Sequence, residues 1–303
     1  MISGMIVVIV MMVSVAFYIV VERKGLGMIQ LRQGPNKVSF KGIFQPISDG
    51  VKLFKKELSF PFSSTRFMFL LGPFICFFCA YCLWLIFPGS FRYSNFELGL
   101  LFFQCISSFS VFGIFLSGWV CDSRYGFLGA MRAVAQSVSY EVFLSTCLYC
   151  PLLLIGSFDL MVIREFPLWF FWVGQEVMIL WLVATLAETN RAPFDFVESE
   201  SELVAGYSVE YGGVGFALMA LAEYSNMLFM SLLVSILFFS GVSSVELISD
   251  MVFIFLLVMV SYFMVWVRGA LPRFRYDLLM GLCWEVLLPL SLCEFMLFLC
   301  ISL

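Results

Sequence analysis

Residues 187–224 read AETNRAPFDFVESESELVAGYSVEYGGVGFALMALAEY, an acidic segment that leads into a long apolar run. Arg191 is the single base in this stretch. The chain as a whole is 62% hydrophobic and only 13% charged. A need for solubility does not explain so many acids in such a chain, so they call for another explanation. The carboxylates are Glu188, Asp195, Glu198, Glu200, Glu202, Glu210 and Glu223.

The composition places the chain among membrane proteins. Mean hydropathy is +1.02, and soluble domains carry about 25% charged residues. A helix that crosses a bilayer needs about 20 apolar residues, and a membrane barrel would show alternation instead of continuous apolar runs. The sequence therefore predicts an all-α polytopic membrane protein with a single transmembrane domain over residues 1–303. About eight spans are expected, near 2–21, 67–88, 98–120, 137–157, 169–187, 214–240, 250–267 and 278–302.

The positions of the basic residues predict the orientation. Fifteen of the 17 Lys and Arg lie in the loops that follow the odd-numbered spans. Because basic loops stay on the cytoplasmic or matrix side, those loops are expected there and both termini on the opposite side. The first run has no positive residue before it and is followed at once by Glu22-Arg23-Lys24, which favours a retained helix over a cleaved signal.

The first long loop, residues 22–66, holds nine of these bases. Within it, QPISDGVKLFKKE places Ile47, Val51 and Phe54 at helical spacing among lysines. This pattern predicts an amphipathic helix lying in the membrane interface. The bases could serve only as a topological anchor, or they could bind a partner.

Histidine is absent from the chain, so proton chemistry falls to carboxylates, Lys, Tyr or water. Cys76, Cys79 and Cys82 echo an iron–sulfur spacing. In ferredoxins, however, such cysteines lie on a loop, whereas here they fall within a predicted span and share a helix face. We interpret them as packing residues and predict no metal site.

The carboxylates also have structural explanations. Asp195 with Glu198, and Ser199 with Glu202, match the spacing of a capping box, and Glu141 could be an interfacial residue that snorkels. Such explanations fit Glu188 and Glu223 poorly, because these two lie within or against spans. A charge at membrane depth is costly and usually serves ions, protons or substrate. A functional role is therefore favoured for Glu188 and Glu223.

Several segments in order along the chain carry a family resemblance. They are Glu22-Arg23-Lys24 with QLRQGPNKV, then QPISDGVKLFKKE, LGAMRAVAQSVSYE, AETNRAPFD with ESELV, LAEYSNM, and WVRGALPRFRYDLLMGLCWEVLLP. Together they resemble subunit 1 of mitochondrial NADH:ubiquinone oxidoreductase, respiratory complex I. Two departures are Ser199, where that family usually has Gly, and Cys121-Asp122 in place of Ser-Asn.

The resemblance implies a core membrane subunit that forms the ubiquinone access tunnel and couples quinone reduction to proton translocation. It implies a quinone-tunnel set of Glu22, Arg23, Arg273 and Arg275. It also implies an acidic proton relay, without direct catalytic chemistry, made of Glu141, Glu188, Asp195, Glu198, Glu200, Glu202, Glu210 and Glu223.

In that family the subunit holds no redox centre of its own; FMN and iron–sulfur clusters sit in partner subunits, and ubiquinone is the substrate. The isolated chain is therefore not expected to be active. The implied partners are hydrophilic quinone-site subunits carrying the terminal iron–sulfur cluster, small membrane-arm subunits and lipids, with no nucleic acid. The implied location is the mitochondrial inner membrane, with the odd-numbered loops in the matrix and both termini toward the intermembrane space.

Two other classes stay open at this point. A stand-alone ion or proton transporter would also place acids in spans, but it should show inverted repeats, which the sequence lacks. The equivalent subunit of a membrane-bound hydrogenase would share the fold and would need no quinone.

Overall fold

The computed structural model describes residues 2–62, 64–89, 96–166, 170–195, 206–239 and 246–302, and within these ranges the regular structure is helical, with no strand. Seven of the described helices are long and apolar enough to cross a membrane. The prediction of an all-α polytopic membrane protein is therefore confirmed.

The long helices correspond closely to the predicted apolar runs. They are α1 (Ile2–Ile29), α3 (Arg66–Trp84), α4 (Gly99–Val120), α5 (Arg124–Ile155), α10 (Gly213–Phe238), α11 (Glu246–Ala270), and a continuous run of α12 (Tyr276–Gly281), π-helical η3 (Leu282–Leu287) and α13 (Leu288–Ser302). The shorter elements are η1 (Phe40–Gly42), α2 (Gln45–Lys55), α6 (Leu160–Glu165), α7 (Phe170–Val173), α8 (Gln175–Glu188) and η2 (Gly206–Ser208).

The fifth predicted span differs from the rest. Its described part is divided at Gly174 into α7 and α8. The 14 residues of α8 extend only about 21 Å at 1.5 Å per residue, less than the thickness of the hydrocarbon core. The sequence shows one apolar run here because hydropathy measures how apolar the side chains are. It does not show where the backbone of a helix is interrupted.

Two helices extend beyond their apolar runs. Helix α1 continues through Glu22-Arg23-Lys24 to Ile29, and α5 begins at Arg124, well before the predicted boundary near 137. Ser123 caps α5 by accepting a hydrogen bond from the backbone N–H of Gly126 at 3.2 Å. Glu141 consequently lies deep inside α5 and not about one turn past its start.

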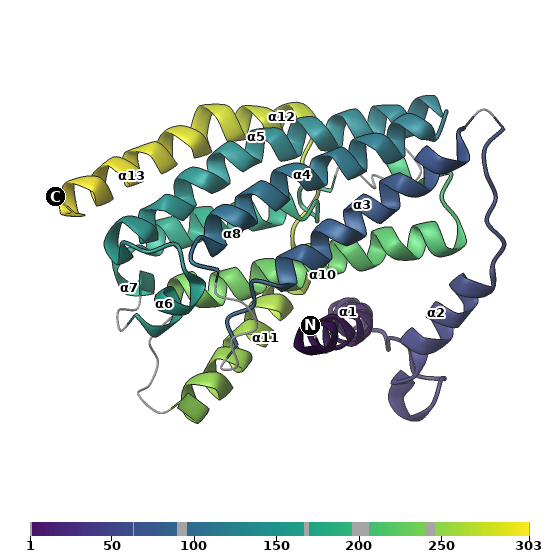
Figure 1. The fold of residues 1–303 in the computed structure, drawn as a ribbon, viewed down its shortest axis with the longest axis horizontal. Helices are drawn as coiled ribbons and strands as arrows, with labels where there is room; N and C mark the ends of the chain where they lie inside the picture. The colour runs from purple at the N-terminus through teal and green to yellow at the C-terminus, as the bar shows by residue number, and fades with distance from the viewer. Residues whose placement is uncertain are drawn as a thin grey trace.

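The spanning helices pack side by side. Figure 1 shows α3, α4, α5 and α13 as neighbouring rods, with α10 crossing beneath them and α1 seen nearly end-on. Small residues permit the close contacts, as is usual between helices in membranes. A Cβ added to Gly118 of α4 would come within 2.1 Å of the Cβ of Ala130 in α5. Cys76, Cys79 and Cys82 lie on α3 and are buried, as the packing interpretation expects.

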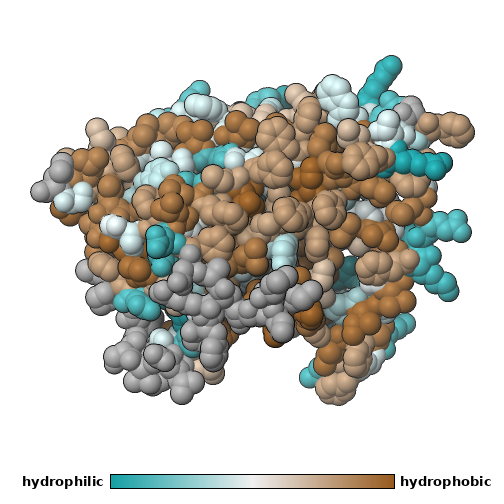
Figure 2. Space-filling model, in the orientation of Figure 1, coloured by the Kyte–Doolittle hydropathy of each residue, from teal (hydrophilic) through white to brown (hydrophobic). Residues whose placement is uncertain are grey.

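The amphipathic helix predicted in the first long loop is present as α2. It stands beside the bundle and not within it (Figure 1), and Ile47, Val51 and Phe54 are all more than half exposed. Figure 2 shows a largely apolar face, with hydrophilic side chains gathered at the edge where α2 and the following loop lie. Helix α2 thus keeps an uncovered apolar side next to a basic one, which is typical of an interfacial helix.

Candidate functional site

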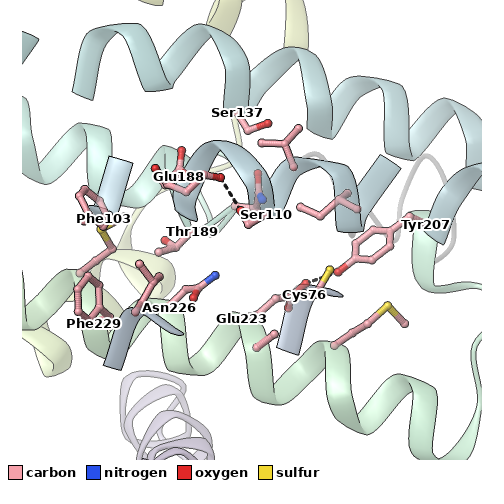
Figure 3. Close-up of a pocket in the computed structure, with 18 residues that line it drawn as sticks. Cys76, Phe103, Ser110, Ser137, Glu188, Thr189, Tyr207, Glu223, Asn226 and Phe229 are labelled. Atoms are coloured by element: carbon pink, nitrogen blue, oxygen red, sulfur yellow. Dashed lines mark hydrogen bonds between the residues drawn. The ribbon is translucent and has the colours of Figure 1, made fainter. Parts of the chain in front are cut away.

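A cavity of about 50 Å³ lies between α3, α4, α5, α8 and α10. This volume is enough for a few water molecules. Glu188 and Glu223 both line it, and Figure 3 shows them on opposite sides, with Asn226 on the same side as Glu223. The two carboxylates that the sequence singled out are therefore brought to one cavity. Cys76, Ser107, Ser110, Ser137, Thr189, Asn190 and Tyr207 also contribute to its wall.

Glu188 is the last residue of α8, and a buried glutamine holds it in place. The side-chain amide of Gln136 in α5 donates to the carbonyl of Ala187 at 2.9 Å and to that of Phe194 at 3.0 Å. The first bond adds a donor to a carbonyl in the last turn of α8, and the second supplies one to a carbonyl in the segment that follows it. Gln136 thereby ties the carboxylate-bearing end of α8 to α5, which also carries the half-buried Glu141, an electrostatic neighbour of Glu188.

Glu223 projects from α10 toward the short turn η2. The hydroxyl of Tyr207 donates a 2.6 Å hydrogen bond to its Oε1. The turn is seated closely on α5, because a Cβ added to Gly129 would lie 2.9 Å from Cα of Gly206. The small residue at position 129 thus permits the approach that brings Tyr207 to the carboxylate.

Three buried oxygens on the cavity wall have no hydrogen-bond partner among the described residues. They are Oε2 of Glu188, Oδ1 of Asn190 and Oδ1 of Asn226. Buried polar atoms are nearly always satisfied by protein or by ordered water. A polar cavity of this size with such acceptors is a place where water binds.

A second polar cluster lies between α1, α10 and α11. The carboxylate of Glu22, whose residue is 2% exposed, pairs with Arg268 and, at 3.4 Å, with Arg191. The guanidinium of Arg191 lies over the ring of Tyr224, 4.4 Å from its centroid. Burial disfavours the charged guanidinium, but Glu22, Tyr224 and Glu223 together outweigh this and hold the pKa of Arg191 above its usual range. Arg191 is therefore a permanent buried charge.

The remaining predicted tunnel bases have separate surroundings. Arg273 pairs with the buried Asp195 at 3.3 Å, whereas Arg275 is exposed and pairs with the exposed Asp277. Arg23 pairs at 2.8 Å with Asp49, which ties α1 to α2. The structure thus places these three bases in three separate ion pairs.

The other predicted relay residues are not all brought to the cavity. Asp195 and Glu141 do not line it, and Glu210 is exposed beyond η2. Glu198, Glu200 and Glu202, with the proposed capping boxes that include them and Ser199, lie outside the described residues. Among the described carboxylates, Glu188 and Glu223 are the two that line the cavity.

Sequence reasoning missed several residues that build these sites. Gln136, Tyr207 and Tyr224 were not singled out, and Arg268 was counted only as a topological base. Gln136 carried a usable signal, because a glutamine inside an apolar helix needs hydrogen-bond partners. For the two tyrosines no comparable signal exists, since tyrosine is common in membrane helices and at their ends.

Comparisons with known proteins agree with this architecture. The family model described as NADH dehydrogenase matches residues 2–299. A protein of Heterololigo bleekeri named NADH-ubiquinone oxidoreductase chain 1 is 47% identical over 302 residues, covering 99% of this chain and 96% of the relative. Proteins with the same name from Aedes aegypti (45% identical; 96% of this chain, 92% of the relative) and Lampetra fluviatilis (43%; 97% and 92%) are also similar. The chain therefore belongs to the NADH dehydrogenase family, among relatives named NADH-ubiquinone oxidoreductase chain 1.

Proposed function

We propose that this chain is a core membrane subunit of a proton-pumping NADH:ubiquinone oxidoreductase, in which it forms the ubiquinone tunnel and an acidic proton relay. The names of the relatives support the enzyme and its substrate. They favour this assignment over a hydrogenase subunit or a stand-alone transporter. Catalysis would require the other subunits of the complex, which supply FMN and iron–sulfur clusters, so the isolated chain is expected to be inactive.

The observation that carries the relay is the shared cavity of Glu188 and Glu223. Water bound to the unpartnered oxygens of Glu188, Asn190 and Asn226 would connect the two carboxylates. Carboxylates in such surroundings can exchange protons without any histidine. Asp195, Glu198, Glu200, Glu202, Glu210 and Glu141 would extend the relay on either side of this central pair.

The tunnel would lie on the side of Glu22, Arg23, Arg273 and Arg275. Support comes from the ion pairs that join α1 to α2, to Arg191 and to α11, and from the burial of Glu22. Bases beside carboxylates could hold the polar headgroup of a quinone by hydrogen bonds. The exposed α2 and its loop would contact hydrophilic subunits and lipid headgroups.

The protein would lie in the mitochondrial inner membrane as a multi-pass subunit. The excess of bases in the loops after the odd-numbered predicted spans supports a matrix location for those loops. Both termini would then face the intermembrane space, beside the small membrane-arm subunits.

The relay is tested by Glu188→Gln in the assembled complex. This change keeps the size of the side chain and one acceptor oxygen and removes its ability to exchange a proton. Quinone-linked NADH oxidation should fall about tenfold or more, which corresponds to at least about 1.4 kcal/mol in the barrier. Glu165→Gln, an exposed carboxylate at the end of α6, is the matched control and should keep normal turnover. Normal turnover and pumping in Glu188→Gln would contradict the relay.

A further inference from the structure

Glu223 and Tyr224 are consecutive residues of α10 that face two different polar clusters. Successive side chains on a helix point about 100° apart. Glu223 lines the cavity with Glu188, while the ring of Tyr224 lies under the guanidinium of Arg191. Arg191 therefore sits at the border between the cavity and the Glu22 cluster.

Arg191 interacts electrostatically with a carboxylate on each side. Its Nη1 is 3.4 Å from Oε1 of Glu22. On the other side, the preceding residue, Asn190, lines the cavity together with Glu223, and the Glu223 carboxylate also helps to raise the pKa of Arg191. The Arg191 side chain is only 7% exposed. Charges that are shielded from water act on one another far more strongly than exposed ones. A shift of this guanidinium toward one carboxylate therefore weakens its effect on the other.

Glu22 pairs with two arginines through one carboxylate oxygen. Both Arg191 and Arg268 donate to its Oε1. The side chain of Arg268 is 30% exposed, against 7% for Arg191. Arg268 is thus the cation that a molecule arriving from outside the cluster can reach, and Arg191 is the one enclosed behind it.

From this arrangement we infer that Arg191 is a positioning residue that transmits the state of the Glu22–Arg268 ion pair to Glu223. The inference rests on the proposed function. When an electron-rich oxygen of the bound substrate draws Arg268 away, Glu22 keeps Arg191 as its cation and attracts it more strongly. Glu223 then loses part of a neighbouring positive charge and takes up a proton delivered through the cavity. When Arg268 returns to Glu22, Arg191 relaxes toward Glu223 and the proton is released.

The test uses infrared difference spectra of the assembled complex, taken between its oxidised and quinol-reduced states. A carbonyl band from a newly protonated carboxyl group, absent in Glu223→Gln, reports proton uptake at Glu223. In Arg191→Met the band should be lost and quinone-linked turnover should fall about tenfold, with KM for quinone changed by less than about twofold. Arg191→Lys keeps the charge and should retain most of the band.

Arg164→Met is the matched control. Arg164 also pairs with a carboxylate, Asp250, and lies over an aromatic ring, that of Phe253 at 4.7 Å. Its partners Asp250, Phe253 and the carbonyl of Pro88 belong neither to the cavity nor to the Glu22 cluster, so its loss should leave the band unchanged. A band of normal size in Arg191→Met, or equal losses in the Lys and Met variants, would overturn the inference.

If Arg191→Met does not assemble, Glu22→Gln gives the same information. Without the competing anion, Arg191 should stay near Glu223, and the band should again be lost; a normal band would overturn the inference. The proposed function has a separate test: normal turnover in Glu188→Gln would contradict it. An inactive Glu188→Gln together with a normal band in Arg191→Met would contradict only the role of Arg191.

Discussion

The hydroxyl of Tyr207 lies 2.6 Å from Oε1 of Glu223, so a tyrosine in the turn η2 donates directly to a carboxylate of the spanning helix α10. Both residues line the cavity that also contains Glu188. This hydrogen bond joins the segment after the acidic loop to the proposed proton path. A change in the conformation of η2 would therefore change the surroundings of the Glu223 carboxylate.

Replacing Tyr207 by Phe should therefore affect turnover more than folding. The variant removes one donor to a charged group, which is worth about 1.5–3 kcal/mol, and keeps the ring. We expect quinone-linked turnover to fall several-fold in a complex that assembles. Tyr211→Phe is the control, because its hydroxyl donates to the carbonyl of Ser117 and does not line the cavity. Equal effects of the two changes would contradict a special role for Tyr207.

Replacing Gln136 by Leu should destabilise the protein around Glu188. The carbonyls of Ala187 and Phe194 would each lose a buried donor. The Ala187 carbonyl keeps the backbone N–H of Asn190, so the main cost is about 1–3 kcal/mol at the carbonyl of Phe194. We expect the complex to lose activity at a lower temperature in thermal inactivation measurements. Gln104→Leu, which removes a single hydrogen bond from Tyr149, should have a smaller effect. An unchanged inactivation temperature for Gln136→Leu would show that this glutamine does not hold α8.

Replacing Arg273 should affect the complex more than replacing Arg275. Arg273→Gln weakens the ion pair of a buried carboxylate, Asp195, whereas Arg275→Gln breaks a pair whose side chains are both more than 70% exposed. Exposed pairs contribute about 0–1 kcal/mol. Arg273→Gln is therefore expected to lower the amount of assembled complex or raise KM for quinone more than Arg275→Gln does. A larger effect at Arg275 would indicate that a partner subunit or quinone binds there.

Gly129→Ala should disturb the packing of η2 against α5. The added methyl would lie within 3.2 Å of backbone atoms of Gly206 and Tyr207, and such overpacking costs about 1–3 kcal/mol. We expect reduced thermal stability and, because Tyr207 moves, reduced turnover. Gly281→Ala is the control, since nothing lies within 4 Å of its added Cβ and Ala favours a helix. A stable, fully active Gly129→Ala would contradict the close packing of η2.

The sequence by itself determined the membrane-spanning helices, the interfacial helix α2 and the abundance of acids near Glu188 and Glu223. These features are local, because hydropathy and helical periodicity depend on neighbours within a few turns. The break at Gly174 and the long polar ends of α1 and α5 were less predictable. Backbone hydrogen bonds continue or stop there for reasons of packing, which hydropathy does not record.

Only the tertiary structure decided which charges meet. Glu22 pairs with Arg191 and Arg268, which are 169 and 246 residues away in the chain, and Gln136 reaches Ala187 across 51 residues. No local pattern encodes such pairs, since each depends on the direction in which separate helices cross. The sequence supplied the carboxylates, but the packing of α3, α4, α5, α8 and α10 selected Glu188 and Glu223 to share one cavity. Burial among these helices separates this pair from an exposed acid such as Glu210.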